Sequence, residues 1–316
     1  MVKLACIFPG QGAQYSGMGK EIAENYEQAM EIFEIASQRL GIDMKKLCFE
    51  GSEEELKKTE NTQPSILTTS VALFEVLKLN GINPDVVAGL SLGEYSALVA
   101  SNAISFSDAV NLVKQRGKYM QEAVPAGEGT MAAVMGMEKD QVLECLKLAS
   151  DAGVVEAVNY NCPGQIVIAG HTKAVERACE ILKEKGARRA ILLPVSAPFH
   201  SSLLKPAGEK LALELDKIEV KDLEIPVIAN VNAQAITDKN KVKQCLIDQV
   251  SSSVLWEDSV RYMIDMGVDT FIEVGPGKSL SAFVKKIDKN VTVFNVEDME
   301  SLKNTIAGIK ERASCN

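Results

Sequence analysis

The chain has 316 residues, 46% of them hydrophobic, and its formal net charge is −9. This length and apolar content suffice for one large core or for a core with a subdomain. The acidic balance argues against free nucleic acid as a partner, because binding phosphates requires a basic face.

The first part of the chain alternates short apolar runs with helical spacing. Val2 to Phe8 ends at Pro-Gly-Gln-Gly, which predicts a buried strand entering a glycine-rich loop. Residues 86–88 form a second apolar run that leads into Gly-x-Ser-x-Gly. Pro64 lies near the start of one helical segment and Gly81 just past its end. Helices are predicted over residues 19–38, 63–79, 92–100 and 106–123.

The pattern changes after Pro125 to the order β-α-β-β-α-β. A hairpin signal at Cys162-Pro163-Gly164-Gln165 joins its two middle strands. This order is that of the split βαβ, ferredoxin-like unit, so we predict an inserted small subdomain over residues 127–196. Its predicted strands are 130–136, 154–159, 166–169 and 190–195, and its helices are 139–149 and 173–185.

The remaining chain returns to α/β alternation. Continuous apolar strands between helices indicate a parallel sheet covered on both faces. The predicted fold class is therefore α/β, with a parallel-sheet, hydrolase-like core formed by residues 1–126 and 197–316. The predicted strands here are 226–231, 268–274 and 291–296, and the helices are 203–218, 241–250, 257–266, 278–286 and 299–312.

Seven cysteines are scattered along the chain without a Cys-x-x-Cys pair. This favours a reducing cytosol over a disulfide framework or a zinc site. The N-terminal apolar run is too short for a signal peptide, and no later run is long enough to span a bilayer. We expect a cytoplasmic protein that binds neither metal nor membrane.

Ser91 occupies the centre of Gly-x-Ser-x-Gly, between a predicted buried strand and a helix. A nucleophile elbow requires this setting, because the small residues let the backbone turn sharply and expose the serine Oγ. N–H groups at the helix start favour developing negative charge. A purely structural turn is the alternative.

A serine nucleophile needs a base, and the chain contains only two histidines. His171 follows the hairpin, where a surface or capping role is expected. His200 lies where a strand gives way to a helix, the position at which an open α/β sheet builds its site. No aspartate in an obvious strand-end turn precedes it, so the pattern favours a Ser-His dyad oriented by a carbonyl or amide. A capping or packing histidine is the alternative.

Together these residues resemble the malonyl-CoA:acyl carrier protein transacylase family of fatty acid synthesis. The similarity runs from end to end, and many motifs in the right order are more specific than any one of them. The matching segments are residues 8–14, 61–64, 89–95, 115–117, 159–165, 198–201 and 273–277.

The resemblance implies a ping-pong acyl transfer without metal or redox cofactor. Ser91 would carry the acyl group as an ester, and His200 would act first as base and then as acid. The backbone N–H groups of Gln11 and Leu92 would form the oxyanion hole. The main-chain carbonyl of Gln249 would hold the histidine ring.

Arg116 matches the residue that binds the free carboxylate of malonate. Burying that carboxylate unpaired would be costly, whereas a planar guanidinium can bind it with two hydrogen bonds. From the sequence alone, a surface arginine is equally compatible. Phe199 would narrow the space beside the acyl α-carbon, which favours malonyl over methylmalonyl.

The sequence departs from the family pattern at two places. Leu90 stands before the nucleophile, where histidine is usual. This removes a polar neighbour of the serine but not its base, so we expect an active enzyme. After Gln249 the chain continues Val-Ser-Ser-Ser-Val-Leu-Trp, where an Asn-Pro pair is common.

The resemblance also implies malonyl-CoA and acyl carrier protein as partners. Because carrier protein is typically acidic, docking would need a local basic patch on this acidic chain. We expect a monomer. The candidates for the patch, each of which could also be simply solvated, are Arg188, Arg189, Lys285 and Lys286.

The sequence is compatible with three other functions. A serine acyl hydrolase or thioesterase would use the same dyad. A non-catalytic interaction protein could keep the fold and close its pocket with Leu90. A dinucleotide-binding enzyme would use Gly10-Gln11-Gly12, although Tyr15 stands where a third glycine is expected.

Overall fold

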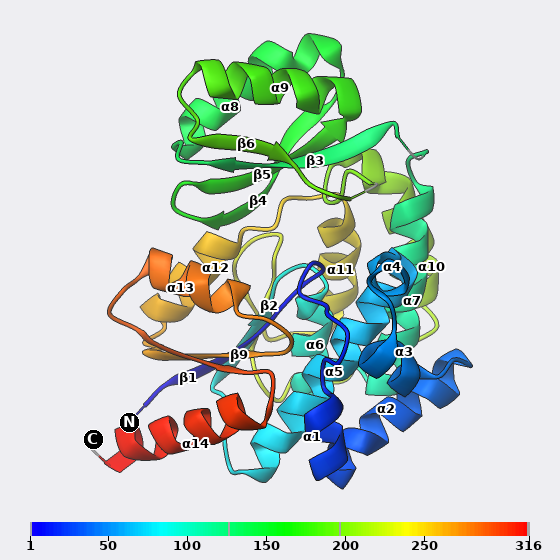
Figure 1. Cartoon of the computed structure of the whole chain (residues 1–316), viewed down its shortest axis with the longest axis vertical. Helices are drawn as coiled ribbons and strands as arrows, with labels where there is room; N and C mark the ends of the chain where they lie inside the picture. The colour runs from blue at the N-terminus through cyan, green and yellow to red at the C-terminus, as the bar shows by residue number, and fades with distance from the viewer. Residues whose placement is uncertain (1, 126, 196, 315–316) are drawn as a thin grey trace.

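The structure, a computed structural model, describes residues 2–125, 127–195 and 197–314. It consists of a large lobe and, at the top of Figure 1, a small lobe with its own sheet. Both ends of the chain lie in the large lobe, so the small lobe is an insertion (Figure 1). The predicted subdomain limits at residues 126 and 196 fall outside the described residues, and the division at those points stays a prediction.

The large sheet has the strand order β10-β9-β1-β2-β7-β8 among the described residues. Neighbouring strands are parallel except for β7 and β8, which are antiparallel. The predicted parallel sheet is therefore confirmed apart from this edge hairpin. The strands are Leu4–Phe8 (β1), Val86–Gly89 (β2), Val227–Ile228 (β7), Ala235–Ile236 (β8), Thr270–Val274 (β9) and Thr292–Val296 (β10).

Helices cover both faces of this sheet because its central strands are apolar on both sides. All of β1 is buried: Cys6 and Phe8 join one hydrophobic cluster, and Ala5 and Ile7 join another. The first cluster includes side chains of α5 (Thr59–Leu79), α6 (Gly93–Ala100), α7 (Phe106–Glu122), α10 (Lys205–Leu215), α11 (Val242–Val250) and α14 (Met299–Ser314). The second includes side chains of α12 (Trp256–Asp265) and α13 (Ser279–Ile287).

The N-terminal helices differ from the prediction. The predicted helix 19–38 is two helices, α1 (Lys20–Asn25) and α2 (Glu27–Leu40), separated at Tyr26 by an extended backbone with φ −131° and ψ 117°. Two helices were not predicted, α3 (Met44–Glu50) and α4 (Glu53–Lys57). The next helix, α5, begins at Thr59, before the predicted residue 63. No helix among the described residues is long and apolar enough to cross a bilayer.

The small sheet has the order β4-β5-β3-β6, and its neighbours are all antiparallel. This is the ferredoxin-like arrangement predicted for the insertion. The helices α8 and α9 pack on the outer face of the sheet, so its other face is turned toward the large lobe (Figure 1). The elements are Gly129–Met135 (β3), Lys139–Ala149 (α8), Val155–Cys162 (β4), Gln165–His171 (β5), Thr172–Glu184 (α9) and Arg189–Leu192 (β6).

Strand β4 ties the two lobes together. The Val254 N–H donates to Val158 O at 2.8 Å, and the Tyr160 N–H donates to Val254 O at 3.0 Å. Two residues of the large lobe add side-chain hydrogen bonds: Ser253 Oγ to Ala157 O at 2.8 Å, and Ser202 Oγ to the Glu156 carboxylate at 2.7 Å. The edge strand β4 of the small sheet is thus held against the loops that follow His200 and Gln249.

Candidate active site

Ser91 lies on a strained turn at the carboxyl end of β2. Its φ is 54°, in the left-handed region that residues other than glycine rarely adopt. Glycines flank it for a steric reason: a Cβ on Gly89 would lie 1.9 Å from the carbonyl carbon of Gly93, and a Cβ on Gly93 would lie 2.1 Å from Phe8 O. The turn therefore has the geometry of a nucleophile elbow.

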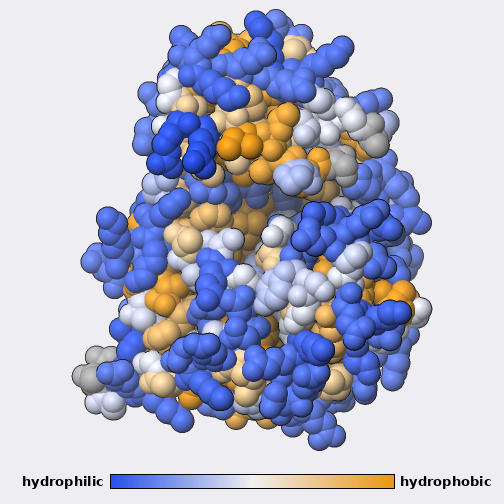
Figure 2. Space-filling model, in the orientation of Figure 1, coloured by the Kyte–Doolittle hydropathy of each residue, from blue (hydrophilic) through white to orange (hydrophobic). Residues whose placement is uncertain are grey.

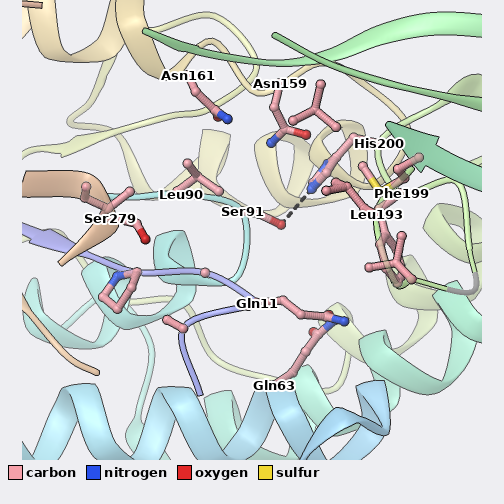
Figure 3. A pocket seen from close by; sticks show the side chains of 18 of the residues that line it. Gln11, Gln63, Leu90, Ser91, Asn159, Asn161, Leu193, Phe199, His200 and Ser279 are labelled. Atoms are coloured by element: carbon pink, nitrogen blue, oxygen red, sulfur yellow. Dashed lines mark hydrogen bonds between the residues drawn. The ribbon is translucent and has the colours of Figure 1, made fainter. Parts of the chain in front are cut away.

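His200 lies against the serine (Figure 3). The distance between Ser91 Oγ and His200 Nε2 is 2.7 Å, and that between His200 Nδ1 and the main-chain oxygen of Gln249 is 2.8 Å. A carbonyl can only accept, so Nδ1 carries the proton and Nε2 is left to accept from the serine hydroxyl.

The electrostatic surroundings keep this imidazole neutral. Burial, followed by the nearby Arg116 cation, lowers the pKa of His200 to about 3, although the Gln249 carbonyl acts in the opposite direction. At neutral pH the ring is therefore an unprotonated base within hydrogen-bond distance of the serine.

Arg116, on α7, is 1% exposed and contacts Ser91. Its Nη2 donates to Ser91 Oγ at 3.1 Å and to Gln249 Oε1 at 2.9 Å, while Nη1 donates to Gln63 Oε1 at 2.9 Å. Burial lowers the pKa of the guanidinium, but an arginine in a protein keeps its proton. The acceptors around this buried cation are neutral, so the position favours an anionic ligand group.

Two backbone N–H groups near the serine are free to bind an oxyanion. The Ser91 N–H is occupied, because it donates to Asn230 Oδ1 at 2.6 Å. The N–H groups of Gln11 and Leu92 donate to no acceptor in the part of the chain that the structure describes. Gly10 lets the Gln11 loop approach the elbow, since a Cβ there would lie 2.5 Å from Leu90 O. This contact accounts for the glycine without a nucleotide.

A cavity of about 270 Å³ lies between the lobes around these groups. Figure 2 shows the hollow, with apolar surface beside it on both lobes. In Figure 3, Asn159 and Asn161 of the small lobe extend from one side of Ser91, and Gln11 and Gln63 lie on the other. Apolar lining residues include Leu90, Met131, Val167, Leu193, Phe199 and Phe283.

Comparison with known proteins identifies the family. The acyl transferase domain family matches residues 5–312. A malonyl CoA-acyl carrier protein transacylase of Bacillus subtilis (strain 168) is 50% identical over 312 residues, 98% of each chain. The chain belongs to the malonyl-CoA:acyl carrier protein transacylase family.

Other transacylases agree with this assignment. A relative of that name from Staphylococcus aureus (strain MRSA252) is 46% identical over 304 residues, 96% of this chain and 98% of the relative. The crystal structure of the Clostridium perfringens transacylase has a TM-score of 0.97 at 52% identity and covers 99% of each chain. A malonyl-transacylase in complex with its type II PKS acyl carrier protein has a TM-score of 0.95 at 40% identity, covering 97% of this chain and 99% of that one.

The structure brings most of the predicted transacylase site together. Ser91 Oγ forms hydrogen bonds with both His200 and Arg116. Gln249 also contacts both His200 and Arg116. His171 is outside this site: its Nδ1 accepts from the Val154 N–H at 3.0 Å. No group of three or more histidine, cysteine, aspartate or glutamate side chains among the described residues could hold a metal ion.

Three buried polar residues at the site were not predicted. Gln63 lies within a motif on which the resemblance rests, Asn-Thr-Gln-Pro, and contacts Arg116. Asn230 follows β7, so the carboxyl end of that strand was the available signal. Glu94 is a carboxylate in a helix whose residues are all buried, and that contrast marks it in the sequence.

Proposed function

We propose that this chain transfers the malonyl group from malonyl-CoA to the pantetheine thiol of acyl carrier protein and so supplies fatty acid chain extension. The observation that carries the proposal is the buried Arg116 guanidinium, 3.1 Å from the Oγ of a serine that is paired with a neutral histidine. The names of relatives at 46–50% identity support the same activity.

In the first half-reaction, Ser91 Oγ attacks the thioester carbonyl while His200 Nε2 takes the hydroxyl proton. The backbone N–H groups of Gln11 and Leu92 bind the developing oxyanion. The carbon–sulfur bond then breaks, and His200 returns the proton to the CoA thiolate. The products are free CoA and a malonyl ester of Ser91.

In the second half-reaction, the pantetheine thiol of the carrier protein enters and gives its proton to His200. The thiolate attacks the ester in the same oxyanion site, and the serine leaves with the proton from His200. The two halves use the same groups in opposite directions, as expected for ping-pong transfer. The Gln249 carbonyl keeps the histidine in the required tautomer throughout.

Arg116 selects the acyl group in this proposal. The malonyl carboxylate would take over the guanidinium contact that Ser91 Oγ now accepts, and the fork of Arg116 can bind both carboxylate oxygens. Acetyl offers no such partner. Phe199, which lines the cavity next to His200, limits the room for a methyl branch on the α-carbon.

A contiguous basic patch is proposed as the docking site for the carrier protein. Arg189 pairs with Met135, Met135 pairs with Gln165, and Lys286 Nζ lies 3.4 Å from Gln165 Oε1. Adjacent strands are about 4.8 Å apart, so Arg189 lies two strand spacings, about 10 Å, from Gln165, the residue that Lys286 contacts. The basic patch consists of Arg188, Arg189, Lys285 and Lys286, all exposed, and Lys285 Nζ also donates to the main-chain oxygen of Val291.

The patch also borders the cavity. Strand β6 runs from Arg189 toward Leu193, which lines the cavity, over about 13 Å. Helix α13 carries Lys285 and Lys286 near its end and lines the cavity with Leu280 and Phe283. A carrier protein bound there could direct its thiol between the lobes.

In this proposal the enzyme is a cytoplasmic monomer. It needs no cofactor, and its substrates are the thioesters of CoA and carrier protein. The CoA and carrier-protein substrates are anionic, which the basic patch complements. Gel filtration at micromolar concentration tests the oligomeric state, and an elution volume matching about twice the chain mass would reject the monomer.

One experiment tests the activity directly: intact-mass measurement after mixing with malonyl-, methylmalonyl- or acetyl-CoA. We expect a malonyl adduct on Ser91 that disappears when carrier protein is added, with malonyl-carrier protein as the product. The methylmalonyl and acetyl adducts should be minor. Release of free malonate as the main product would instead identify a hydrolase, and the absence of any acyl-enzyme would reject the enzyme hypothesis.

A further inference from the structure

Glu94 is a buried carboxylate beside the nucleophile that the mechanism above does not use. It lies three residues after Ser91, in the first turn of α6, and its side chain is fully buried. No lysine or arginine among the described residues forms an ion pair with it. Its Oε2 instead accepts two N–H groups, from the Asn230 backbone at 3.0 Å and from Gln249 Nε2 at 2.8 Å.

Asn230, the first partner, braces the elbow. Its side-chain Oδ1 accepts from the Ser91 N–H at 2.6 Å, and its Nδ2 donates to Gly89 O at 2.7 Å. The side chain of Asn230 therefore bridges the main chain of Gly89 and Ser91 across the turn, while its own backbone N–H donates to Glu94. A shift of Asn230 would move the backbone that aims the serine.

Gln249, the second partner, connects the elbow to the cation. Its Nε2 donates to both Glu94 and Ser91 O, the latter at 3.0 Å, and its Oε1 accepts from Arg116. A reversed amide would turn donors toward the guanidinium and an acceptor toward the carboxylate, so Glu94 dictates which end of the amide faces Arg116. The main-chain oxygen of the same residue accepts from His200.

We infer that Glu94 is a positioning residue of the acyl transfer, acting through Asn230 on Ser91 and through Gln249 on Arg116 and His200. The inference rests on the proposed function for its account of acyl selectivity. What Glu94 supplies is an acceptor oxygen at the place where the backbone of Asn230 and the side chain of Gln249 meet.

The property of Glu94 that holds the network is its hydrogen-bond acceptor oxygen and not its negative charge. Burial raises the pKa of Glu94 to about 7, although the N–H groups of Gln249 and Asn230 and the charge of Arg116 act against the shift. A proton can reside on Oε1, which has no hydrogen-bond partner among the described residues, while Oε2 keeps both N–H groups. Both protonation states therefore hold the network, and a glutamine in this place would hold it too.

The test compares Glu94→Gln, which keeps an acceptor oxygen, with Glu94→Leu, which removes it. Glu273→Leu is the matched control: it removes another buried carboxylate, which accepts from the Leu280 and Ser281 N–H groups at 3.1 and 2.7 Å and is not part of the Glu94 network. For each variant, malonyl and acetyl transfer kinetics, labelling of Ser91 by a fluorophosphonate and Tm are measured.

We expect Glu94→Leu to lower kcat for malonyl transfer on the order of 100-fold, because a misplaced reacting group costs about this much. Its preference for malonyl over acetyl and its rate of fluorophosphonate labelling should fall as well. Glu94→Gln should retain most of all three. Glu273→Leu should lower Tm with the malonyl preference unchanged.

Three results would overturn the inference. These are wild-type rate and preference in Glu94→Leu, equal damage by Glu94→Gln at similar Tm, or equal loss of preference in Glu273→Leu. Failure of the proposed function is visible separately, since the wild-type enzyme would then form no malonyl-serine. In that case fluorophosphonate labelling still decides whether Glu94 positions Ser91 and His200.

Discussion

At the scale of single residues, the site combines one buried cation with uncharged neighbours. The guanidinium of Arg116 contacts Ser91, Gln63 and Gln249 but no carboxylate among the described residues. The Gln249 amide lies between Arg116 and Glu94 and bonds both. A buried cation in this state gains strongly from an anion, since the desolvation of the arginine has already occurred on folding. The free enzyme thus already contains the counter-charge for a dicarboxylic acyl group.

Arg116→Ala should therefore change the acyl preference as well as the rate. We expect malonyl transfer to fall on the order of 100-fold or more, as for loss of a charged hydrogen bond, while acetyl transfer rises relative to it. The measurement is kcat/KM for both thioesters, with the exposed Arg39→Ala as control. An unchanged ratio would refute carboxylate binding by Arg116.

Ser91→Ala should abolish covalent labelling by radioactive malonyl-CoA. The label depends on the Ser91 hydroxyl, which contacts His200 Nε2. Ser96→Ala, which removes a buried hydroxyl from α6, the helix that follows the turn at Ser91, should keep the label. Undiminished label in Ser91→Ala would reject the nucleophile.

The pH dependence of acylation should lack the usual histidine titration. Lowering the pKa of His200 to about 3 keeps the base form populated far below pH 6.5, so protonation should not slow acylation between pH 5 and 8. The measurement is kcat/KM as a function of pH in the Glu94→Gln variant. This variant lacks the carboxyl group whose pKa is about 7, so its titration cannot be mistaken for that of His200. A loss of rate centred near pH 6.5 would contradict a buried neutral histidine.

The sequence reveals these residues to different degrees, for physical reasons. Ser91 has a local steric signature in its glycines, and His200 follows from the scarcity of histidine. The Gln249 carbonyl has no signature, because every residue carries one, and only the resemblance pointed to it. Asn230 and Glu94 meet across 136 residues, and no local pattern encodes such a contact.

At the scale of elements, apolar periodicity predicts most helices and central strands because burial produces that periodicity. This periodicity does not reveal a break in a helix when the residues on both sides of the break are buried. Ile22 and Phe33 are both buried on either side of the break at Tyr26, so the pattern continues through it. Short elements such as α4 and the two-residue β7 offer too few residues to show a period.

The turn at Ser91 depends on a close contact between Gly93 of α6 and Phe8 of β1, and Gly93→Ala tests that contact. The added Cβ would meet Phe8 O of β1 at 2.1 Å, so either the sheet or the turn must shift. We expect the free energy of unfolding to fall by about 3 kcal/mol, at the upper end for overpacking. Urea denaturation measures it.

Gly186→Ala is the control for that variant. Its φ is 101° and its surroundings are open, so it should lose only the conformational cost of about 1–2 kcal/mol. Equal losses for the two variants would contradict the steric account of the elbow.

At the scale of the whole molecule, the site is assembled between two lobes. Ser91, His200 and Arg116 come from the large lobe. The small lobe lines the cavity with Asn159, Asn161 and Leu193. The ferredoxin-like insertion was predictable from its order of elements. Its contact with the loop at Val254 was not, because that bridge joins segments about 95 residues apart.

Charge reversal at the basic patch should affect the carrier protein selectively. Arg188→Glu with Arg189→Glu, or Lys285→Glu with Lys286→Glu, should raise KM for carrier protein several-fold, with a smaller effect at high salt. The rate of malonyl-CoA loading should stay near the wild-type value. Steady-state kinetics with each substrate varied in turn provide the measurement.

The control reverses two lysines of α14, Lys303→Glu with Lys310→Glu. These residues are exposed at the end of the molecule opposite the small lobe (Figure 1). The net charge changes by the same amount as in the test variants. An equal rise in KM for this control would assign the effect to overall charge and reject the patch.

The bond from His200 to the main-chain oxygen of Gln249 has a consequence for mutational scanning. Every amino acid placed at position 249 brings a carbonyl with it, so no substitution can delete the acceptor. A complete library at this position would report only on the amide and its contacts with Glu94, Ser91 and Arg116. The part of Gln249 that bonds His200 would be invisible in such a data set, and tolerance of substitutions at this position would say nothing against the importance of that bond.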